Sequence, residues 1–367
     1  MEENQPKARV LAYYLPQFHP IPENDEWWGK GFTEWTNVGK AKPLFPGHYQ
    51  PHVPADLGYY DLRVPETRQA QADMARQYGI EGFVYWHYWF GNGKRLLERP
   101  FNEVLESGRP DFPFALAWAN ESWGGSFHGK IKGGKTLIEQ EYGGDKDYIE
   151  HFSCVLKAFK DKRYILVDGK PIFVIYKPDL LPDAKQFIDL WRNMALESGL
   201  KGIYFIGIAN VLYDGLDSVK TLEHYQEMGF DAMNVVNMFD HGRGFLYKLK
   251  RKILIKWLNM PDIRNYDYEL MKDKTDSYAN VFPTVYPNWD HTPRTGHRGI
   301  IVTGTSPKKW GVALQQMIDR ITHKPFDKRI LFVKSWNEWA EGNYLEPDLK
   351  FGRQYLEELS NVIMQKK

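Results

Sequence analysis

The chain has 367 residues, a formal net charge of +1 and a single cysteine. This charge balance gives no general case for a nucleic acid partner, and one cysteine excludes an internal disulfide. The N-terminus shows no basic region followed by an apolar core, and no apolar run approaches the length of about 18 residues that a membrane span needs. We therefore expect a soluble, cytoplasmic protein.

Apolar runs of strand length recur along the chain and alternate with helical patterns. The expected strands are 9–18, 79–90, 112–121, 171–178, 202–209, 231–239, 280–290 and 329–339. Several of these runs are continuously apolar, which is typical of strands buried on both faces of a parallel sheet. The expected helices are 65–79, 145–159, 183–199, 218–229, 306–321 and 352–366.

Eight strands alternating with helices favour an α/β fold of the (β/α)8 TIM barrel type. A doubly wound open sheet is the alternative, but no expected strand is followed by a glycine-rich phosphate loop. No break in composition marks a domain boundary, so we expect residues 1–367 to form one catalytic domain with long βα loops. Two insertions are expected, at about 19–64 and 240–279, the first rich in Pro, Trp and His and the second basic.

Aromatic side chains make up 15% of the chain and gather with polar groups where the expected strands end. Large stiff rings with a polar tip suit the flat apolar faces of sugars, although a core built from large rings is the alternative. Because function in a barrel collects at the carboxyl ends of the strands, this placement favours a carbohydrate cleft. The expected substrate-binding residues are Tyr13, Tyr14, Trp35, Trp86, His87, Trp89, Asn120, Glu121, Trp123, Trp289, Trp336, Asn337 and Tyr344.

Four glutamates lie where they could cleave a glycosidic bond, which usually needs two carboxyl groups. They are Glu34, Glu121, Glu338 and Glu341. Glu121 and Glu338 follow asparagines at two different strand ends, whereas Glu338 and Glu341 would share one side of a helical turn. Both pairings stay open on these grounds, and any single glutamate could instead pair with a nearby Arg or Lys.

Four segments resemble the WbsX-type proteins of bacterial polysaccharide gene clusters over nearly the whole chain. They are "YYLPQFHPIPENDEWWGKGFTEWTNV", "FVYWHYWF", "WANESW" and "SWNEWAEGNYLEP". A more distant resemblance is to glycoside hydrolase family 99, the endo-α-mannosidases, and it is clearest in the Asn-Glu-Trp-x-Glu-Gly pattern at 337–342. It implies a retaining barrel hydrolase that acts without a metal on an α-linked, mannose-like glycan of bacterial surface polysaccharide metabolism.

The family 99 resemblance also implies roles for the two glutamates of this pattern. Glu338 matches the residue that takes the proton from the substrate 2-hydroxyl, whose oxygen then attacks the anomeric carbon to give a 1,2-anhydro sugar. Glu341 matches the general acid that protonates the leaving oxygen and later activates water. Both are expected to be catalytic.

Two other functions stay open on the sequence. A glycosyltransferase or transglycosylase of O-antigen or capsule assembly is the runner-up, although no nucleotide-sugar Rossmann domain or Asp-x-Asp motif is evident. A catalytically silent sugar-binding protein is the third, and the intact glutamate pair argues against it. The expected partner is an oligosaccharide or polysaccharide, free or lipid-linked. No cofactor is expected, and no metal, because the histidines lack metal-ligand spacing.

A basic segment at 247–259 mixes five cations with leucine, isoleucine and tryptophan. The cations are Lys248, Lys250, Arg251, Lys252 and Lys256. Such a segment predicts a weak contact with a membrane surface, where a lipid-linked glycan would lie. The alternative is an outer barrel helix whose basic face is solvated.

Overall fold

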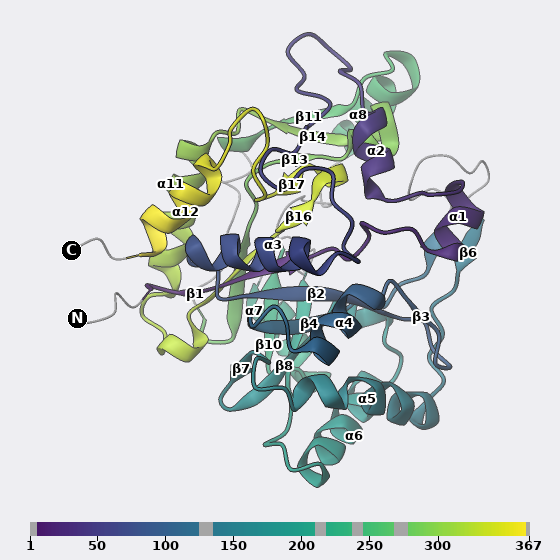
Figure 1. Ribbon diagram of the computed structural model, residues 1–367, viewed down its shortest axis with the longest axis vertical. Helices are drawn as coiled ribbons and strands as arrows, with labels where there is room; N and C mark the ends of the chain where they lie inside the picture. Colours follow the sequence, from purple (N-terminus) through teal and green to yellow (C-terminus); the bar gives the residue numbers. More distant parts are fainter. Residues whose placement is uncertain (1–5, 125–134, 210–217, 237–244, 268–277, 365–367) are drawn as a thin grey trace.

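Eight parallel strands close into a barrel in the computed structural model, which describes residues 6–124, 135–209, 218–236, 245–267 and 278–364 (Figure 1). The strands are β1 (Arg9–Tyr14), β2 (Gly82–Trp89), β4 (Phe114–Trp118), β8 (Lys170–Ile175), β9 (Tyr204–Ala209), β10 (Ala232–Val235), β12 (Val281–Val285) and β15 (Ile330–Val333). β1 pairs with both β2 and β15, which closes the ring. The predicted (β/α)8 barrel is confirmed, and each strand lies inside an expected range except that β8 begins one residue early.

The strands form because their residues have apolar surface to bury on both sides. Every residue of β1, "RVLAYY", and of β2, "GFVYWHYW", is buried. One face of each strand points into the barrel and the other meets the surrounding helices, as the continuous apolar runs predict. Successive side chains point to opposite faces, so neighbouring aromatics on one strand serve different layers.

The helices found by sequence pattern surround the barrel. They are α3 (Pro65–Gln77), α5 (Asp145–Phe159), α6 (Ala184–Glu197), α7 (Ser218–Glu227), α11 (Pro307–Ile321) and α12 (Gln354–Ile363). α11 shows why such a helix begins where it does, since the Ser306 side chain accepts a hydrogen bond from the Lys309 amide and Pro307 takes the first position. α4 (Arg99–Ser107) was not expected.

The expected insertions contain regular structure rather than loops alone. Residues 19–64 carry α1 (Pro22–Trp28) and α2 (Glu34–Lys40). Within 240–279 lie α8 (Phe245–Trp257) and β11 (Asp262–Asn265), whereas 240–244 and 268–277 fall outside the described residues. β11 pairs with β14 (Ile300–Thr303), which pairs with β13 (Trp289–Asp290). Figure 1 shows this small sheet and α8 beside α2, on one side of the barrel.

Short elements complete the chain near the end of β15. β16 (Asn337–Glu338) and β17 (Asn343–Tyr344) form a hairpin around the 3-10 helix η5 (Trp339–Glu341). The remaining short elements are β3 (Arg95–Leu96), β5 (Trp123–Gly124), β6 (Thr136–Ile138), β7 (Leu166–Val167), α10 (Thr292–Thr295), η1 (Pro178–Leu180), η3 (Gly296–Arg298) and η4 (Phe326–Lys328). Within the described ranges, no helix has the length and apolar character to cross a bilayer.

Candidate active site

A pocket of about 110 Å³ opens where the barrel strands end. Its walls include residues that follow β1, β4, β8 and β15, and residues at the carboxyl end of β2. It is lined by Leu15, Gln17, Trp86, Tyr88, Ala119, Glu121, Tyr176, Trp123, Arg294, Lys334, Glu338 and Glu341. Three of the four glutamates expected from the sequence therefore meet in one cavity, at the end of the barrel where function is expected.

The turn after β15 presents Glu338 and Glu341 to this pocket. The Asn337 side chain accepts a hydrogen bond from the Leu15 amide at 2.8 Å and donates to the Leu15 carbonyl at 3.0 Å, which ties the turn to the end of β1. Gly342 ends η5 with a φ of +66°, and a Cβ there would lie 2.6 Å from the backbone nitrogen of Asp290. Only glycine fits at position 342 without strain. Gly342 therefore allows the turn that carries both glutamates to pack closely against Asp290.

Glu338 is buried, and its surroundings favour the protonated carboxyl group. Burial raises the pKa of Glu338 to about 8, and the neighbouring Glu341 carboxylate adds to this shift, whereas Lys334 opposes it. The indole Nε1 of Trp86 donates a hydrogen bond to Glu338 Oε1 at 3.0 Å. The Trp86 ring, in the pocket wall, thus fixes the orientation of the Glu338 carboxyl group.

Glu341 is held ionised by cations. Burial alone would raise the pKa of Glu341, but Arg294 and Lys334 hold that pKa well below its usual range, whereas burial lowers the pKa of nearby His291 to about 4 and so keeps that ring neutral. Arg294 donates directly to Glu341 Oε1, while Lys334 Nζ lies 3.7 Å from Oε2 and His291 Nε2 lies 4.0 Å from Oε1. Lys334 Nζ is slightly farther from Glu338, at 4.0 Å, so the nearer cations favour the charge on Glu341.

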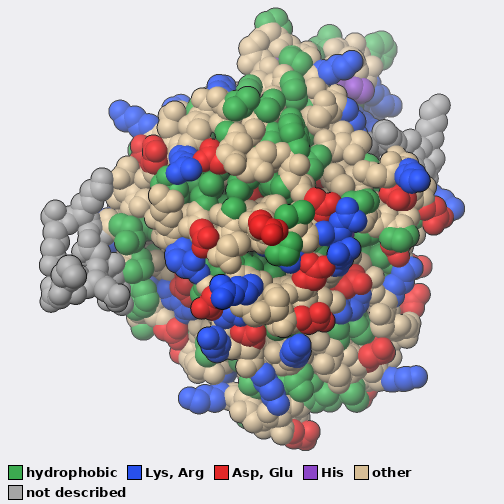
Figure 2. Space-filling model, in the orientation of Figure 1, with side chains coloured by type: hydrophobic (Ala, Val, Ile, Leu, Met, Phe, Trp, Pro, Cys, Tyr) green, Lys and Arg blue, Asp and Glu red, His purple; other side chains and the backbone are tan. Residues whose placement is uncertain are grey.

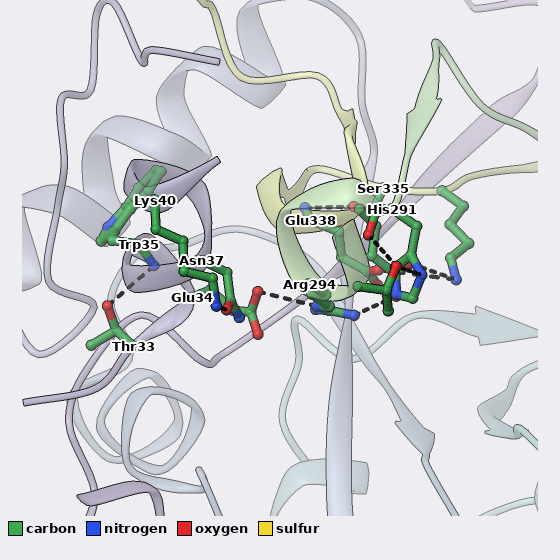
Figure 3. Close-up of polar contacts among 12 residues, drawn as sticks. Thr33, Glu34, Trp35, Asn37, Lys40, His291, Arg294, Ser335 and Glu338 are labelled. Carbon is green, nitrogen blue, oxygen red and sulfur yellow. Dashed lines mark hydrogen bonds and ion pairs between the residues drawn. The ribbon is translucent and has the colours of Figure 1, made fainter. Parts of the chain in front are cut away.

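Arg294 links this pocket to the insertion at 19–64. Its Nε donates to Glu34 Oε2 at 3.2 Å, and Glu34, at the start of α2, is completely buried (Figure 3). Burial opposes the charged form of Arg294, but Glu34 and Glu341 raise the pKa of Arg294 well above its usual range. Glu34 thus lies outside the pocket wall and acts as the partner of a cation, the alternative left open for a single glutamate.

Glu121 lines the same pocket from the end of β4. Burial raises the pKa of Glu121, and Lys177 and Lys334 partly offset that effect. The geometry therefore brings together the members of both candidate pairs, Glu121 with Glu338 and Glu338 with Glu341. The second pair is distinguished by opposite pKa shifts within one turn.

The aromatic residues expected at the end of β2 divide between two faces. Trp86 lines the pocket and stacks on Tyr13 with ring centroids 4.9 Å apart. His87 and Trp89 face α5 instead, where His87 Nε2 lies 2.8 Å from His151 Nε2 and Trp89 donates to Asp147. The structure does not bring these two to the cleft, because alternate side chains of a strand point to opposite sides.

β1 shows the same division. The Tyr13 hydroxyl donates to Asn234 inside the barrel, whereas the Tyr14 hydroxyl donates to Gln71 on α3. Tyr13 therefore forms the floor behind Trp86, and Tyr14 belongs to the layer between barrel and helices. Trp123, on β5, lines the pocket as expected.

The remaining expected residues support the pocket from behind. Trp336 is fully buried against Phe83, and Tyr344 stacks on Trp339 with centroids 3.8 Å apart. Trp35 packs against that same Trp339 at 5.5 Å. These rings belong to the core that carries the turn of Glu338 and Glu341 rather than to the pocket wall.

Two further expected residues make supporting contacts. The Asn120 side chain donates to the Lys177 carbonyl at 2.9 Å and accepts from the Lys177 amide at 2.8 Å. The Trp289 ring lies below Lys334, whose Nζ is 5.4 Å from the ring centroid, and it lines a separate cavity of about 160 Å³. Asn120 thus fixes the main chain after β8, and Trp289 packs against the side chain of Lys334.

Sequence reasoning missed the cations of the pocket, Arg294 and Lys334, and the ring of Tyr176. Lys334 directly precedes the "SWNEW" motif, so its place at a strand end was an available signal. Arg294 follows the strand end "YPNWDH" within the short helix α10, and nothing in its local pattern marks it. Among the described residues, no group of three or more His, Cys, Asp or Glu side chains is placed to hold a metal ion.

The fold and the pocket define a (β/α)8 barrel with two carboxyl groups at the end of its last strand. Residues 10–359 match the family described as Glycosyltransferase WbsX, and the chain belongs to that family. The resemblance to WbsX-type proteins seen in the sequence is thereby confirmed. Protein WxcX of Xanthomonas campestris pv. campestris is 35% identical over 360 residues, which cover 95% of this chain. The chain spans 49% of the length of that relative.

Solved structures share the fold at low sequence identity. The GH99 endo-alpha-mannosidase of Bacteroides thetaiotaomicron, in complex with BIS-TRIS-Propane, superposes with a TM-score of 0.56 at 14% identity, over 96% of this chain and 95% of that one. A structure described as a glycoside hydrolase-like protein gives a TM-score of 0.56 at 14% identity, over 100% of this chain and 96% of the other. These likenesses show the barrel fold.

Proposed function

We propose that this protein is a retaining glycoside hydrolase, similar to family 99, that cleaves an α-linked, mannose-like glycan of bacterial surface polysaccharide metabolism. The observation that carries the proposal is the Glu338–Glu341 pair. The two carboxyl groups face one pocket from a single turn and differ in charge, since burial raises one pKa and cations lower the other. Two carboxyl groups in different protonation states are what glycosidic bond cleavage requires.

The proposed reaction proceeds through the substrate's own 2-hydroxyl. One glutamate takes the hydroxyl proton while that oxygen attacks the anomeric carbon. The bond to the leaving oxygen breaks, and the other glutamate protonates that oxygen. Water, which loses a proton to the second glutamate, then opens the 1,2-anhydro sugar at the anomeric carbon, and the first glutamate returns its proton to the 2-oxygen. Two carboxyl groups on one short segment suit neighbouring oxygens of one sugar better than opposite faces of its ring.

The family resemblance gives the base role to Glu338 and the acid role to Glu341. The surroundings favour the proton on Glu338, whose pKa burial raises, and the charge on Glu341, whose pKa Arg294 and Lys334 lower. The family roles therefore require one proton to pass from Glu338 to Glu341 when substrate binds. Without that transfer the two roles are exchanged, and substrates with different leaving groups distinguish these cases.

A transglycosylase or glycosyltransferase of O-antigen or capsule assembly is the second candidate. The description of the family supports it, since members are grouped as glycosyltransferases. The same pocket would transfer a sugar if an acceptor hydroxyl replaced water in the second step. A lipid-linked glycan and a cytoplasmic location fit this assembly role and belong to the same proposal.

Product analysis tests the proposal. Purified protein is incubated with defined α-linked mannooligosaccharides and bacterial surface polysaccharides, with and without an activated glycosyl donor. We expect new reducing ends, and none with the Glu338→Gln, Glu341→Gln double variant. Longer glycans made only with the donor would favour transfer. No product of either kind from any substrate, together with intact glycan binding, would favour a sugar-binding protein.

A further inference from the structure

Helix α8 carries a stripe of large apolar side chains on its solvent-facing side. Leu249, Ile253 and Trp257 follow one another at intervals of four residues, and their exposed fractions are 42%, 43% and 81%. Side chains four residues apart lie on one face of a helix. Leu258, just after the end of α8, is also exposed, at 59%. A continuous exposed apolar face of this kind marks an interaction surface.

Lysines border this stripe on both sides. At about 100° per residue, Lys250 lies on one side of the stripe, and Lys252 and Lys256 lie on the other. All three side chains are exposed. The helix sequence, "FLYKLKRKILIKW", contains no acidic residue. The surface is therefore apolar along its centre and positive along both edges.

The opposite face of α8 is the one that holds the helix in place. Leu254 and Ile255 are partly buried, and the Tyr247 hydroxyl donates to the Asp262 carboxylate and accepts from Arg264 of β11. The apolar residues of the helix therefore divide between an inner face and an outer one. Contacts with the rest of the protein explain why the inner face is apolar. They do not explain why the outer stripe of Leu249, Ile253 and Trp257 is apolar.

The stripe stands at an outer surface of the molecule. Figure 1 places α8 at the top of the view beyond β11, and Figure 2 shows hydrophobic and Lys or Arg side chains together in this region. The small sheet that carries α8 also contains β13, whose Asp290 meets the active-site turn at Gly342. A surface bound at α8 would thus lie on the same side of the barrel as this sheet and the turn it contacts.

We propose that α8 docks on an anionic lipid bilayer, with the stripe entering the headgroup layer and the lysines contacting lipid phosphates. Positive edges on both sides of an apolar centre match a uniformly negative surface. Lysine stems can lie along the apolar layer while their ammonium groups stay at the phosphates. A helix with an apolar face and basic flanks lies in the plane of such an interface. This docking does not depend on the chemistry proposed for the pocket.

Co-sedimentation with vesicles tests the docking. The whole chain is mixed with vesicles of phosphatidylcholine alone, or with phosphatidylglycerol added, at low and at physiological salt. We expect binding to the anionic vesicles that weakens with salt. Lys250→Glu, Lys252→Glu and Lys256→Glu together should lower the partition coefficient at least about tenfold, and Trp257→Ala should lower it at both salt concentrations.

The matched control reverses three exposed lysines on and just after α5, with Lys146→Glu, Lys157→Glu and Lys160→Glu. Figure 1 shows α5 on the other side of the barrel from α8. This control should bind vesicles as the wild type does, and an equal loss of binding would overturn α8 as the docking surface. A wild type that stays in solution with anionic vesicles at both salt concentrations would overturn the proposal altogether.

A second measurement reports insertion directly. An environment-sensitive dye is attached after Trp257→Cys in a Cys154→Ser background, and its emission is recorded with and without anionic vesicles. We expect a shift to shorter wavelength on binding. Sedimentation without any shift would show that the charges bind while the stripe stays in water, which contradicts the proposed mode.

Discussion

The guanidinium of Arg294 forms an ion pair with the carboxylate of Glu341 at a place where both side chains are largely buried. The same guanidinium contacts Glu34, so one cation serves two buried carboxylates from distant parts of the chain. Removing one partner of a buried pair leaves a charge that is neither solvated nor neutralised. Arg294 therefore affects both the stability of the fold around the pocket and the charges inside it.

Arg294→Met should lower the free energy of unfolding by about 3–5 kcal/mol. Arg294→Lys should lose less, because it keeps the charge but not the forked geometry. Chemical denaturation at neutral pH measures both. Lys185→Met is the control, since Lys185 pairs with Asp189 where both side chains are exposed, and it should cost about 0–1 kcal/mol. An Arg294→Met variant as stable as its control would contradict this account.

Glu338→Gln and Glu341→Gln should each lower turnover by at least about 10²-fold, the scale expected for losing a general acid or base. Glycan binding should survive, because Trp86 and Trp123 remain in the pocket wall. Steady-state kinetics on a glycan substrate measure the loss of turnover, and a separate assay measures glycan binding. Glu121→Gln should remain much more active, and finding it the least active of the three would establish the cross-barrel pair instead.

Leaving groups separate the roles of the two glutamates. A dinitrophenyl glycoside needs no proton on its leaving oxygen, so it should rescue the variant that lacks the general acid. If the proton passes to Glu341 in the complex, Glu341→Gln regains turnover on this substrate and Glu338→Gln does not. The opposite result would assign the acid role to Glu338, the residue whose pKa burial raises.

The contribution of Glu338 to stability should fall as the pH rises from about 4.5 to 8. Burial raises the pKa of Glu338 to about 8, whereas an unfolded glutamate titrates near about 4.3. Between these values the folded chain binds one proton more at Glu338 than the unfolded chain, so this contribution is lost toward the higher value, by up to about 1.4 kcal/mol per pH unit. Glu346, whose pKa burial raises to about 7, adds to this trend. Buried histidines such as His87 and His291, whose pKa burial lowers to about 3 and about 4, act in the opposite sense below about 6.5, so the comparison with a Glu338 variant isolates the effect.

Glu338→Gln should reduce this pH dependence, because a neutral amide has no proton to lose. At pH 8 the variant should then unfold at a higher temperature than the wild type while being nearly inactive. Thermal unfolding measured from about pH 5 to 8 gives both curves. Parallel curves for the two proteins would show that Glu338 is ionised in the folded state.

Two tryptophans on the same side of the barrel should respond differently to truncation. Trp123 lines the pocket, and Trp123→Ala should weaken glycan binding about tenfold. Trp89 faces α5, and Trp89→Ala should lower the free energy of unfolding by about 3–5 kcal/mol without changing the affinity of the molecules that fold. Calorimetric binding and thermal unfolding separate the two. Weakened binding in folded Trp89→Ala would place that ring in the substrate path.

The barrel could be predicted from the sequence because its strands are buried on both faces. Each such strand reads as one apolar run, and eight runs separated by helical patterns leave few alternatives. The same property hides which side chains point inward. Tyr13 and Tyr14, or Trp86 and Trp89, are equally apolar in their patterns, and only the pleat of the folded strand separates pocket from core.

The acids of the site could be found, whereas the cations around them could not. Glu338 and Glu341 belong to a motif at a strand end, so their position alone marks them. Arg294 reaches the pocket from a different segment and is paired with Glu34, more than 250 residues away in the sequence. Contacts over such distances depend on the closed barrel and leave no local pattern.

The contact between Asn337 and the backbone of Leu15 has a consequence for when the pocket is assembled during synthesis. These residues are 322 positions apart, and they lie where the first and last barrel strands meet. A ribosome-bound chain that has emerged only through its seventh strand holds most of the cavity wall, Glu121 included, but not Glu338 or Glu341. The proposed pair of carboxyl groups is therefore completed in one late step, when the final strand enters beside the first.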